Sequence, residues 1–274
     1  MNLRYLLPRL ARHFLPERLT RFLLRRGWII RPGLETREPA LAAARYAETL
    51  AAHGLTLAGK RVLVFGYGGR FALGVDLLRR GAAHVVLCDR FAPPDHRRNR
   101  DLLPAAQDCL LARGAEVWPR PEFITLVQED IRTAAQKRLF PPVDLALSAS
   151  VFEHLPAADM DGITAALAAL TLPGGAHLHF VDLRDHFFKY PFEMLTFSER
   201  AWRNWLNPTS NLNRFRLGDY RQVFESHFPQ VEMTVLERDE AAFARLRSRV
   251  RPGFVTGDDQ TDSVTQMQVL ARRT

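Results

Sequence analysis

Hydrophobic and polar positions alternate with two different periods along this 274-residue chain. Short apolar runs bounded by glycine, proline or polar residues predict strands, and apolar residues spaced three and four apart predict helices. The predicted strands cover residues 61–66, 84–89, 123–128, 143–148 and 176–182, followed by two late alternating runs at about 230–238 and 263–272. The predicted helices cover residues 39–53, 72–80, 98–113, 131–138, 158–171 and 217–227.

Strands and helices that alternate in this way form βαβ units, which build a parallel sheet covered by helices. The two late runs, joined by a loop, predict an antiparallel hairpin that closes the sheet. We therefore expect an α/β fold, a Rossmann-like three-layer sandwich with a mostly parallel seven-stranded sheet. It would occupy residues 39–274 and follow a short helical extension over residues 1–38.

The extension is amphipathic and basic. Its apolar residues recur at helical spacing between breaks at Pro8 and Pro16: Leu6, Leu10, Phe14, Leu19, Phe22 and Leu23. Residues 1–31 hold eight arginines and one acid, whereas the other 243 residues hold 30 basic and 29 acidic side chains, so +7 of the net charge of +8 belongs to residues 1–31. Two interpretations stay open: residues 1–30 contact an anionic membrane surface or a protein, or they pack on the domain with their arginines solvated.

Composition narrows the class of protein further. A basic face on the catalytic body is usual in nucleic-acid enzymes, and the near-neutral body argues against a nucleic-acid partner. The two cysteines, Cys88 and Cys109, have no disulfide or zinc-ligand spacing, which favours a reducing compartment. We expect a cytoplasmic protein. The basic extension suggests the alternative that the protein lies peripherally at the inner face of a membrane.

The most informative segment runs from Val62 to Arg70 and reads Val-Leu-Val-Phe-Gly-Tyr-Gly-Gly-Arg, a buried strand followed by a glycine-rich turn. The next predicted strand ends in Asp89. Glycines let the backbone approach a nucleoside ligand, and an acid after the second strand binds its ribose hydroxyls. The dinucleotide pattern needs a third glycine after Gly69-Arg70, and its absence counts against NAD. An NAD(P)-dependent oxidoreductase remains the alternative enzyme.

Three later segments point to one family. Asp130 follows the third predicted strand, Val-Phe-Glu-His-Leu at 151–155 follows the fourth, and Leu-Pro-Gly-Gly at 172–175 precedes the fifth. In their order and spacing, residues 40–272 resemble the class I S-adenosylmethionine-dependent methyltransferases of the small-molecule branch. The resemblance implies S-adenosyl-L-methionine as the cofactor.

The resemblance also implies which residues bind this cofactor: Gly66, Tyr67, Gly68, Asp89, Arg90, Asp130, Ile131 and Ser148. The glycines would line its methionine part, Asp89 would hold the ribose, Asp130 and the Ile131 backbone would contact the adenine, and Ser148 would sit beside the sulfonium. The chain departs from the family at Val64, where an acid is usual, and at Arg70, where a third glycine is frequent. Gly69 and Gly74 are the candidates to compensate.

Candidate catalytic residues gather where the fifth strand ends. His177 and His179 share one face of this strand, and Asp182, Asp185 and His186 follow at its carboxyl end, the edge where open α/β sheets bind ligands. A hydroxyl acceptor needs a base, so we expect His154 or His186 in that role, with Asp182 or Asp185 orienting the acceptor. The alternative is a divalent metal held by the His/Asp cluster; our preferred site contains no metal.

An aromatic-rich insertion at about 183–216 is expected to form a lid over the acceptor. Residues 187–220 contain nine of the 27 aromatic residues, and a connection of this length is usually functional. The alternative is that most of these rings pack the segment onto the domain. Arg214 and Arg216 would contact an anionic acceptor or be solvated. We thus expect a methyltransferase that O-methylates a small or lipid-linked acceptor such as a glycan precursor; the non-enzymatic alternative is a methyltransferase-like assembly protein.

Overall fold

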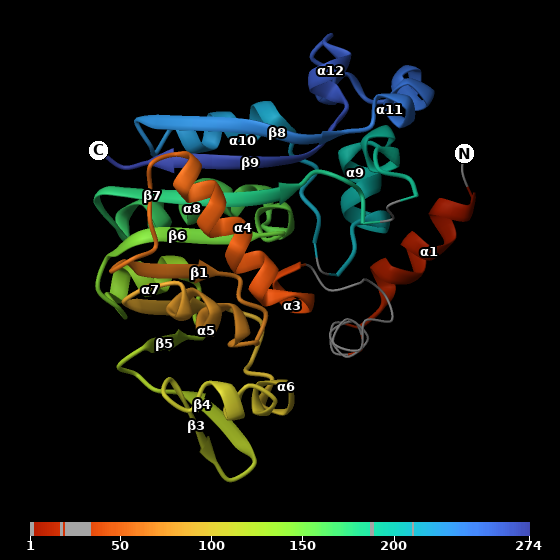
Figure 1. Ribbon diagram of the computed structural model, residues 1–274. Coiled ribbons are helices and arrows are strands. Elements are labelled where there is room, and N and C mark those ends of the chain that lie inside the picture. The colour runs from red at the N-terminus through yellow and green to blue at the C-terminus, as the bar shows by residue number, and fades with distance from the viewer. Residues whose placement is uncertain (1–2, 17–18, 20–33, 187–188, 210) are drawn as a thin grey trace.

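A seven-stranded sheet lies between two layers of helices in the computed structural model, which describes residues 3–16, 19, 34–186, 189–209 and 211–274 (Figure 1). The strand order is β5-β2-β1-β6-β7-β9-β8, and the pairs are parallel except β7 with β9 and β9 with β8. The strands are β1 (Arg61–Phe65), β2 (His84–Cys88), β5 (Ile124–Val127), β6 (Val143–Ala149), β7 (Thr171–Asp182), β8 (Gln230–Arg238) and β9 (Val264–Arg272). The predicted fold class and its closing hairpin are confirmed.

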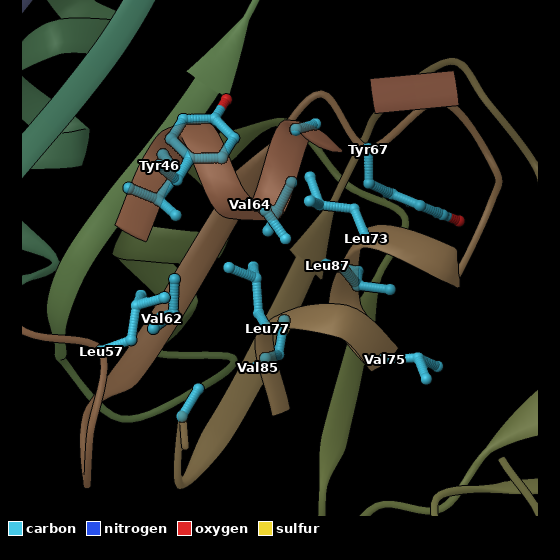
Figure 2. Packing of buried hydrophobic residues seen from close by; sticks show 14 of the residues in the cluster. Tyr46, Leu57, Val62, Val64, Tyr67, Leu73, Val75, Leu77, Val85 and Leu87 are labelled. Carbon is cyan, nitrogen blue, oxygen red and sulfur yellow. The ribbon is translucent and has the colours of Figure 1, made fainter. Parts of the chain in front are cut away.

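Alternate strand residues face opposite helical layers, because successive side chains of a strand point to opposite faces. Val62 and Val64 of β1 pack with helices α4 and α5 (Figure 2), whereas Leu63 and Phe65 pack on the other face with α7, α8 and α10. The helices are α1 (Leu3–Phe14), α3 (Leu34–Arg37), α4 (Pro39–Ala52), α5 (Ala72–Arg79), α6 (His96–Arg100), α7 (Ile131–Lys137), α8 (Met160–Ala169), α9 (Glu199–Ala201), α10 (Leu217–Glu225), α11 (Glu240–Leu246) and α12 (Asp259–Asp262).

The helix predicted over residues 98–113 is wrong. Helix α6 ends at Arg100, and the chain then forms an antiparallel hairpin of β3 (Leu110–Arg113) and β4 (Glu116–Pro119). Pro104 lies where the predicted helix would need a backbone N–H donor, and Gly114 turns the hairpin with a φ of 61°. The local pattern of apolar residues did not distinguish a long helix from a short helix followed by a hairpin.

Helix α1 packs against the lid region and forms a third hydrophobic cluster with it (Figure 1). The lid region contains the short turns η4 (Glu193–Thr196) and η5 (Trp202–Leu206), with α9 between them. Pro8 lies inside α1, so the break predicted there is wrong, whereas α1 ends at Phe14 ahead of Pro16. The apolar positions predicted at Phe22 and Leu23 lie outside the described residues. Among the described residues, no helix is both long and apolar enough to cross a bilayer.

Candidate active site

The loop after β1 has a backbone that only glycine adopts easily. Gly66, Gly68 and Gly69 have φ angles of 82°, 69° and 84°. A Cβ atom at Gly66 would lie 2.4 Å from the Val151 side chain, and one at Gly69 would lie 2.5 Å from the Pro93 carbonyl oxygen. The glycines therefore bring the loop against the segments that follow β2 and β6, at the carboxyl edge of the sheet.

Asp89 stands directly after β2 and is fixed to this loop. Its carboxylate accepts hydrogen bonds from the backbone N–H groups of Gly68 at 3.1 Å, Phe91 at 2.8 Å and Ala92 at 2.9 Å. A carboxylate offers about four lone-pair sites, so Asp89 retains capacity for a ligand hydroxyl. The structure thus brings the predicted loop and the predicted ribose acid together.

Gly74 takes over the packing task of the missing third glycine. A Cβ atom there would lie 3.3 Å from Leu87 and 3.5 Å from Val85, so glycine keeps α5 close to β2. Tyr67 is buried against Phe71, with ring centroids 6.3 Å apart, and its hydroxyl donates to the Ala92 carbonyl at 3.4 Å. Tyr67 therefore supports the loop from within the core, where its side chain does not line an open site.

Asp130 begins helix α7 and is engaged by two arginines. Its oxygens accept from the Arg132 backbone and side chain at 2.7–2.9 Å and from Arg90 at 2.9 Å. These hydrogen bonds, chiefly those from the Arg132 side chain, lower the pKa of Asp130 to about 2. The neighbouring Ile131 is buried. A shallow polar pocket opens here, lined by Arg90, Gln128, Glu129, Asp130, Arg132 and Thr133.

Ser148 is the first of four buried polar side chains that are linked in a row by hydrogen bonds. Its hydroxyl lies 2.8 Å from Nδ1 of His179, whose Nε2 lies 3.2 Å from Nδ1 of His177, and Nε2 of His177 lies 2.6 Å from the Thr171 hydroxyl. All four side chains are buried, and the position of Ser148 beside the sulfonium stays a prediction. The shared environment predicted for the two histidines is confirmed, and burial lowers the pKa of His177 to about 3.

The two alternative candidates for the base, His154 and His186, lie side by side, with ring centroids 4.7 Å apart. His154 follows β6 in a short 3-10 turn, η2 (Phe152–His154), and its Nδ1 lies 2.8 Å from the Asn211 carbonyl oxygen. Glu153 joins them, and one ligand atom from each of the three residues lies within 4.8 Å of the others. Burial and then the neighbouring positive groups hold the pKa of His186 well below its usual range, so its ring is neutral.

Glu153 is a buried acid whose carboxylate oxygens make no hydrogen bond of normal geometry to any described residue. Burial is the main reason that its pKa lies well above the usual range, and the nearby carboxylate of Asp182 adds to the shift. The backbone amides of Glu153 and Asp182 lie near enough to offset part of it. Asp182 itself is paired with Arg184, at 2.8 Å between Oδ2 and Nη2.

Asp185 lies apart from this cluster, in the contact between α1 and the lid region. Its carboxylate pairs with Arg9 and accepts from the Tyr5 hydroxyl, and all three side chains are fully buried. Asp185 therefore docks α1, which gives it a different task from the predicted one of orienting an acceptor. Arg9 and Arg12 are both buried, so the prediction that the extension keeps its arginines solvated is wrong for them.

Arg214 and Arg216 are also buried, which contradicts both predicted environments. Arg214 donates to the carbonyl oxygens of Met194 at 3.1 Å and Phe197 at 2.8 Å and pairs with Glu199. Arg216 donates to three backbone carbonyl oxygens, those of Leu183, Asp262 and Val264. A guanidinium carries five donors, so one side chain can satisfy several carbonyls of an irregular segment.

Most rings of the lid region pack inward. Phe192, Trp202 and Tyr220 are buried, whereas Trp205 is 55% exposed. Phe187 and Phe188 lie outside the described residues. The alternative that these rings pack the segment onto the domain therefore holds for these three, whereas Trp205 faces solvent.

Comparison with known proteins gives similarity in structure alone. No family model matches the sequence, and no curated protein matches it. A solved structure described as an O-methyltransferase from Nostoc punctiforme superposes with a TM-score of 0.54 at 11% identity, covering 98% of this chain and 67% of that one. One described as a sarcosine dimethylglycine methyltransferase from Galdieria sulphuraria gives 0.52 at 16% identity, covering 87% and 91%. The fold is that of the class I methyltransferases.

In this methyltransferase fold, a charged group that the sequence did not reveal lies near the glycine loop. Tyr46 of α4 donates a hydrogen bond to Glu35 of α3, and the Arg45 guanidinium lies 3.6 Å above the ring of Phe180, at the carboxyl end of β7. Glu35 keeps some exposed surface, yet burial of its carboxyl group raises its pKa to about 7. Helix α3 also contacts α5, which starts at the end of the glycine loop. The sequence signal was weak, because Glu35 stands outside the predicted methyltransferase domain.

Proposed function

We propose that this protein is an S-adenosylmethionine-dependent methyltransferase. The observation that carries the proposal is the Asp89 carboxylate, held by the Gly68 amide at the carboxyl edge of a sheet with the methyltransferase strand order. Gly66 and Gly68 would line the methionine part, and Asp89 would bind the ribose hydroxyls. The antiparallel β8–β9 hairpin and the absent third glycine both argue against the NAD(P)-dependent alternative.

The cofactor's ends would meet charged groups. The pocket of Arg90, Gln128, Asp130 and their neighbours is polar and lies beside Asp89 in sequence and in the sheet, which suits the adenine and its amino group. Since Asp130 already serves two arginines, the backbone of this segment is the better adenine contact. At the other end, Glu35 and Arg45 have the charges that an amino acid's ammonium and carboxylate require. Glu35 would then take the role of the acid that the family usually has at the position of Val64.

The acceptor atom is proposed to be oxygen. S-adenosylmethionine carries an activated methyl group, so the protein must mainly hold the acceptor in line with it and remove the acceptor's proton. His154 is the better base of the two candidates: its Nδ1–H can donate to the Asn211 carbonyl, which leaves the lone pair on Nε2. The depressed pKa of His186 makes that ring a weaker base.

A small or lipid-linked acceptor, such as a glycan precursor, fits the surface beside the lid region. Leu3, Leu7 and Phe14 of α1 are 61–65% exposed, and Phe14 contacts the exposed Trp205 with ring centroids 6.0 Å apart. An exposed apolar stripe with a tryptophan and a basic neighbouring sequence is typical of segments that lie on a membrane surface. We propose that α1 and Trp205 hold the protein peripherally at the inner face of a membrane.

Calorimetry with S-adenosylhomocysteine tests the cofactor proposal. We expect 1:1 binding, and we expect Asp89→Ala to weaken it at least about 10-fold, since a charge-assisted hydrogen bond of about 1.5 kcal/mol or more to a ribose hydroxyl is lost. Asp101→Ala, an exposed acid near the same edge, is the matched control. Absence of binding by the wild type, or equal binding by Asp89→Ala, would overturn the proposal. Binding of NADH in its place would favour the oxidoreductase.

A further inference from the structure

We propose that Glu153, His154 and His186 form a binding site for a divalent transition-metal ion. The three side chains converge at the carboxyl edge of the sheet, and one ligand atom from each lies within 4.8 Å of the other two. Around an ion with ligands at about 2.1 Å in tetrahedral geometry, ligand atoms are roughly 3.4 Å apart, so small side-chain rotations complete the site.

The carboxylate of Glu153 supplies an independent argument for a cation. This side chain is 2% exposed, and within the described part of the chain neither of its oxygens makes a hydrogen bond of normal geometry. A buried acid is unfavourable unless it is well paired, and the nearby Ser150 side chain and the backbone amides of Glu153 and Asp182 offset only part of the cost of burial. Coordination of an ion gives the carboxylate a partner and neutralises its charge.

The surroundings also orient His154 as a metal ligand does in known sites. Nδ1 of His154 lies 2.8 Å from the Asn211 carbonyl oxygen, and the Asn211 side chain donates back to the His154 carbonyl at 3.0 Å. When Nδ1–H donates to a carbonyl, the lone pair stands on Nε2, and ligating histidines are usually held by such a bond. Asn211 is in turn held by Asn207 at 2.8 Å.

The ligand types select the class of ion. Two imidazoles and one carboxylate suit Zn²⁺, Mn²⁺ or Fe²⁺, whereas Mg²⁺ and Ca²⁺ prefer oxygen ligands throughout. Three protein ligands leave at least one position open, as in catalytic zinc sites. Gly66 lies beside this turn, since a Cβ atom at that position would contact Val151, so two of the three ligands follow directly after the segment that touches the loop proposed for the methyl donor.

This site deepens the proposed function and rests on it for its catalytic role. An acceptor hydroxyl bound at the open position would have a lowered pKa and would release its proton to water. The oxygen's electron pair then forms the bond to the methyl carbon while the carbon–sulfur bond breaks and its pair stays on sulfur. With the ion bound, His154 and His186 act as ligands, and the ion replaces the histidine base.

Metal titration of the full-length protein tests the site without any methyl transfer. After treatment with EDTA and dialysis, Co²⁺ is added and its visible d–d absorption is followed, with Zn²⁺ as competitor. We expect one equivalent per chain. Loss of a ligand in Glu153→Gln or His186→Gln is expected to weaken binding at least about 100-fold, because even outer-shell changes cost 10- to 100-fold.

The control is His227→Gln, which removes a histidine that lies 2.8 Å from Asp161 away from the site and is expected to leave the titration unchanged. Thermal denaturation verifies that each variant is folded; if Glu153→Gln does not fold, wild-type stoichiometry and His186→Gln decide. Absence of stoichiometric binding, binding that survives both ligand changes, or a cobalt–thiolate band from Cys88 or Cys109 would each overturn the site. S-adenosylhomocysteine calorimetry on the metal-free protein separates this outcome from failure of the proposed function.

Discussion

The carboxyl edge of the sheet, where we propose that ligands bind, is held by different kinds of interaction at its two ends. At the β1–β2 end, positive-φ glycines and backbone amides position a single carboxylate, Asp89. At the lid end, charged side chains are buried to hold an irregular chain: Arg9 with Asp185, and Arg216 with three carbonyls. At the first end the Asp89 contacts lie within one βαβ unit and the loop also approaches Val151 after β6, whereas the Tyr5–Asp185 contact joins residues 180 positions apart. The glycine-loop end is therefore fixed by neighbouring strands of the sheet, and the lid end depends on helix α1.

The largest effect is expected from Arg9→Met, which leaves Asp185 buried without its ion-pair partner. Removing one member of a buried pair typically costs about 3–5 kcal/mol. Urea denaturation should show a loss of this size in the free energy of unfolding, with the extra hydrogen exchange concentrated in α1. The double variant Arg9→Met/Asp185→Leu should recover much of it, because no isolated charge remains.

Arg4→Met is the matched control, since Arg4 is an exposed arginine of the same helix. If Arg9→Met costs no more than Arg4→Met, the buried pair does not dock α1. The contrast between the two ends of the carboxyl edge would then disappear.

Gly66→Ala should have the next largest effect, at the opposite end. The left-handed backbone costs about 1–2 kcal/mol for alanine, and the contact with Val151 adds about 1–3 kcal/mol of overpacking. A second change, Val151→Ala, should return part of this cost in denaturation experiments. Gly114→Ala has a φ of 61° and open space around it, so it should show only the backbone cost. Equal losses for Gly66→Ala and Gly114→Ala would contradict the close approach to Val151.

Lowering the pH should reduce the free energy of unfolding, because His177 and His179 are buried. The folded pKa of His177 is about 3, below its unfolded value, so its contribution is complete above about pH 6.5 and is lost as the pH falls towards 3. Between pH 7 and 5 the free energy of unfolding should fall by about 2 kcal/mol on account of His177, and His179 acts in the same direction. In His177→Gln this share of the pH dependence should vanish; an unchanged slope would show that His177 is not the titrating group.

The smallest effect is expected from Arg90→Ala. Arg90 is 54% exposed, and an exposed ion pair is typically worth less than about 1 kcal/mol. Arg132 continues to hold Asp130. Denaturation should therefore show almost no change, in contrast to Arg9→Met. A loss above about 2 kcal/mol in the free energy of unfolding would mean that the exposed ion pair at this end stabilises the protein about as much as the buried one at the other end.

The same division explains what could be predicted from the sequence. Strands β1, β2 and β6 follow from runs such as Val62–Phe65, and Asp89 follows from its place after the second strand, because these signals lie within a short stretch of chain. His154 and His186 were each predicted as the base from the edge where their strands end, and the structure places the two rings side by side. Gly74 was expected to compensate by lengthening the turn, whereas it lies inside α5 and lets this helix pack closely on Leu87.

The remainder depended on contacts between distant segments. Nothing near Asp185 in the sequence indicates that Arg9 will occupy its carboxylate, so an acid at a strand end was assigned to the acceptor. Ser148 was assigned to the cofactor from the family resemblance, and its hydrogen bond with His179 of β7 could not be read from the sequence near it. Glu153 was noted as part of a motif, yet the burial of its carboxylate depends on the folded structure around it and could not be read from the sequence.

Helix α1 also has a consequence for synthesis of the chain. Its docking partner Asp185 is added 180 residues after Tyr5, which at about 5–20 residues per second means a wait of roughly 10–35 s. During that interval helix α1 lacks the partner on which it docks, and Arg9 has no Asp185 to pair with. Helix α1 is thus made well before the segment that buries it.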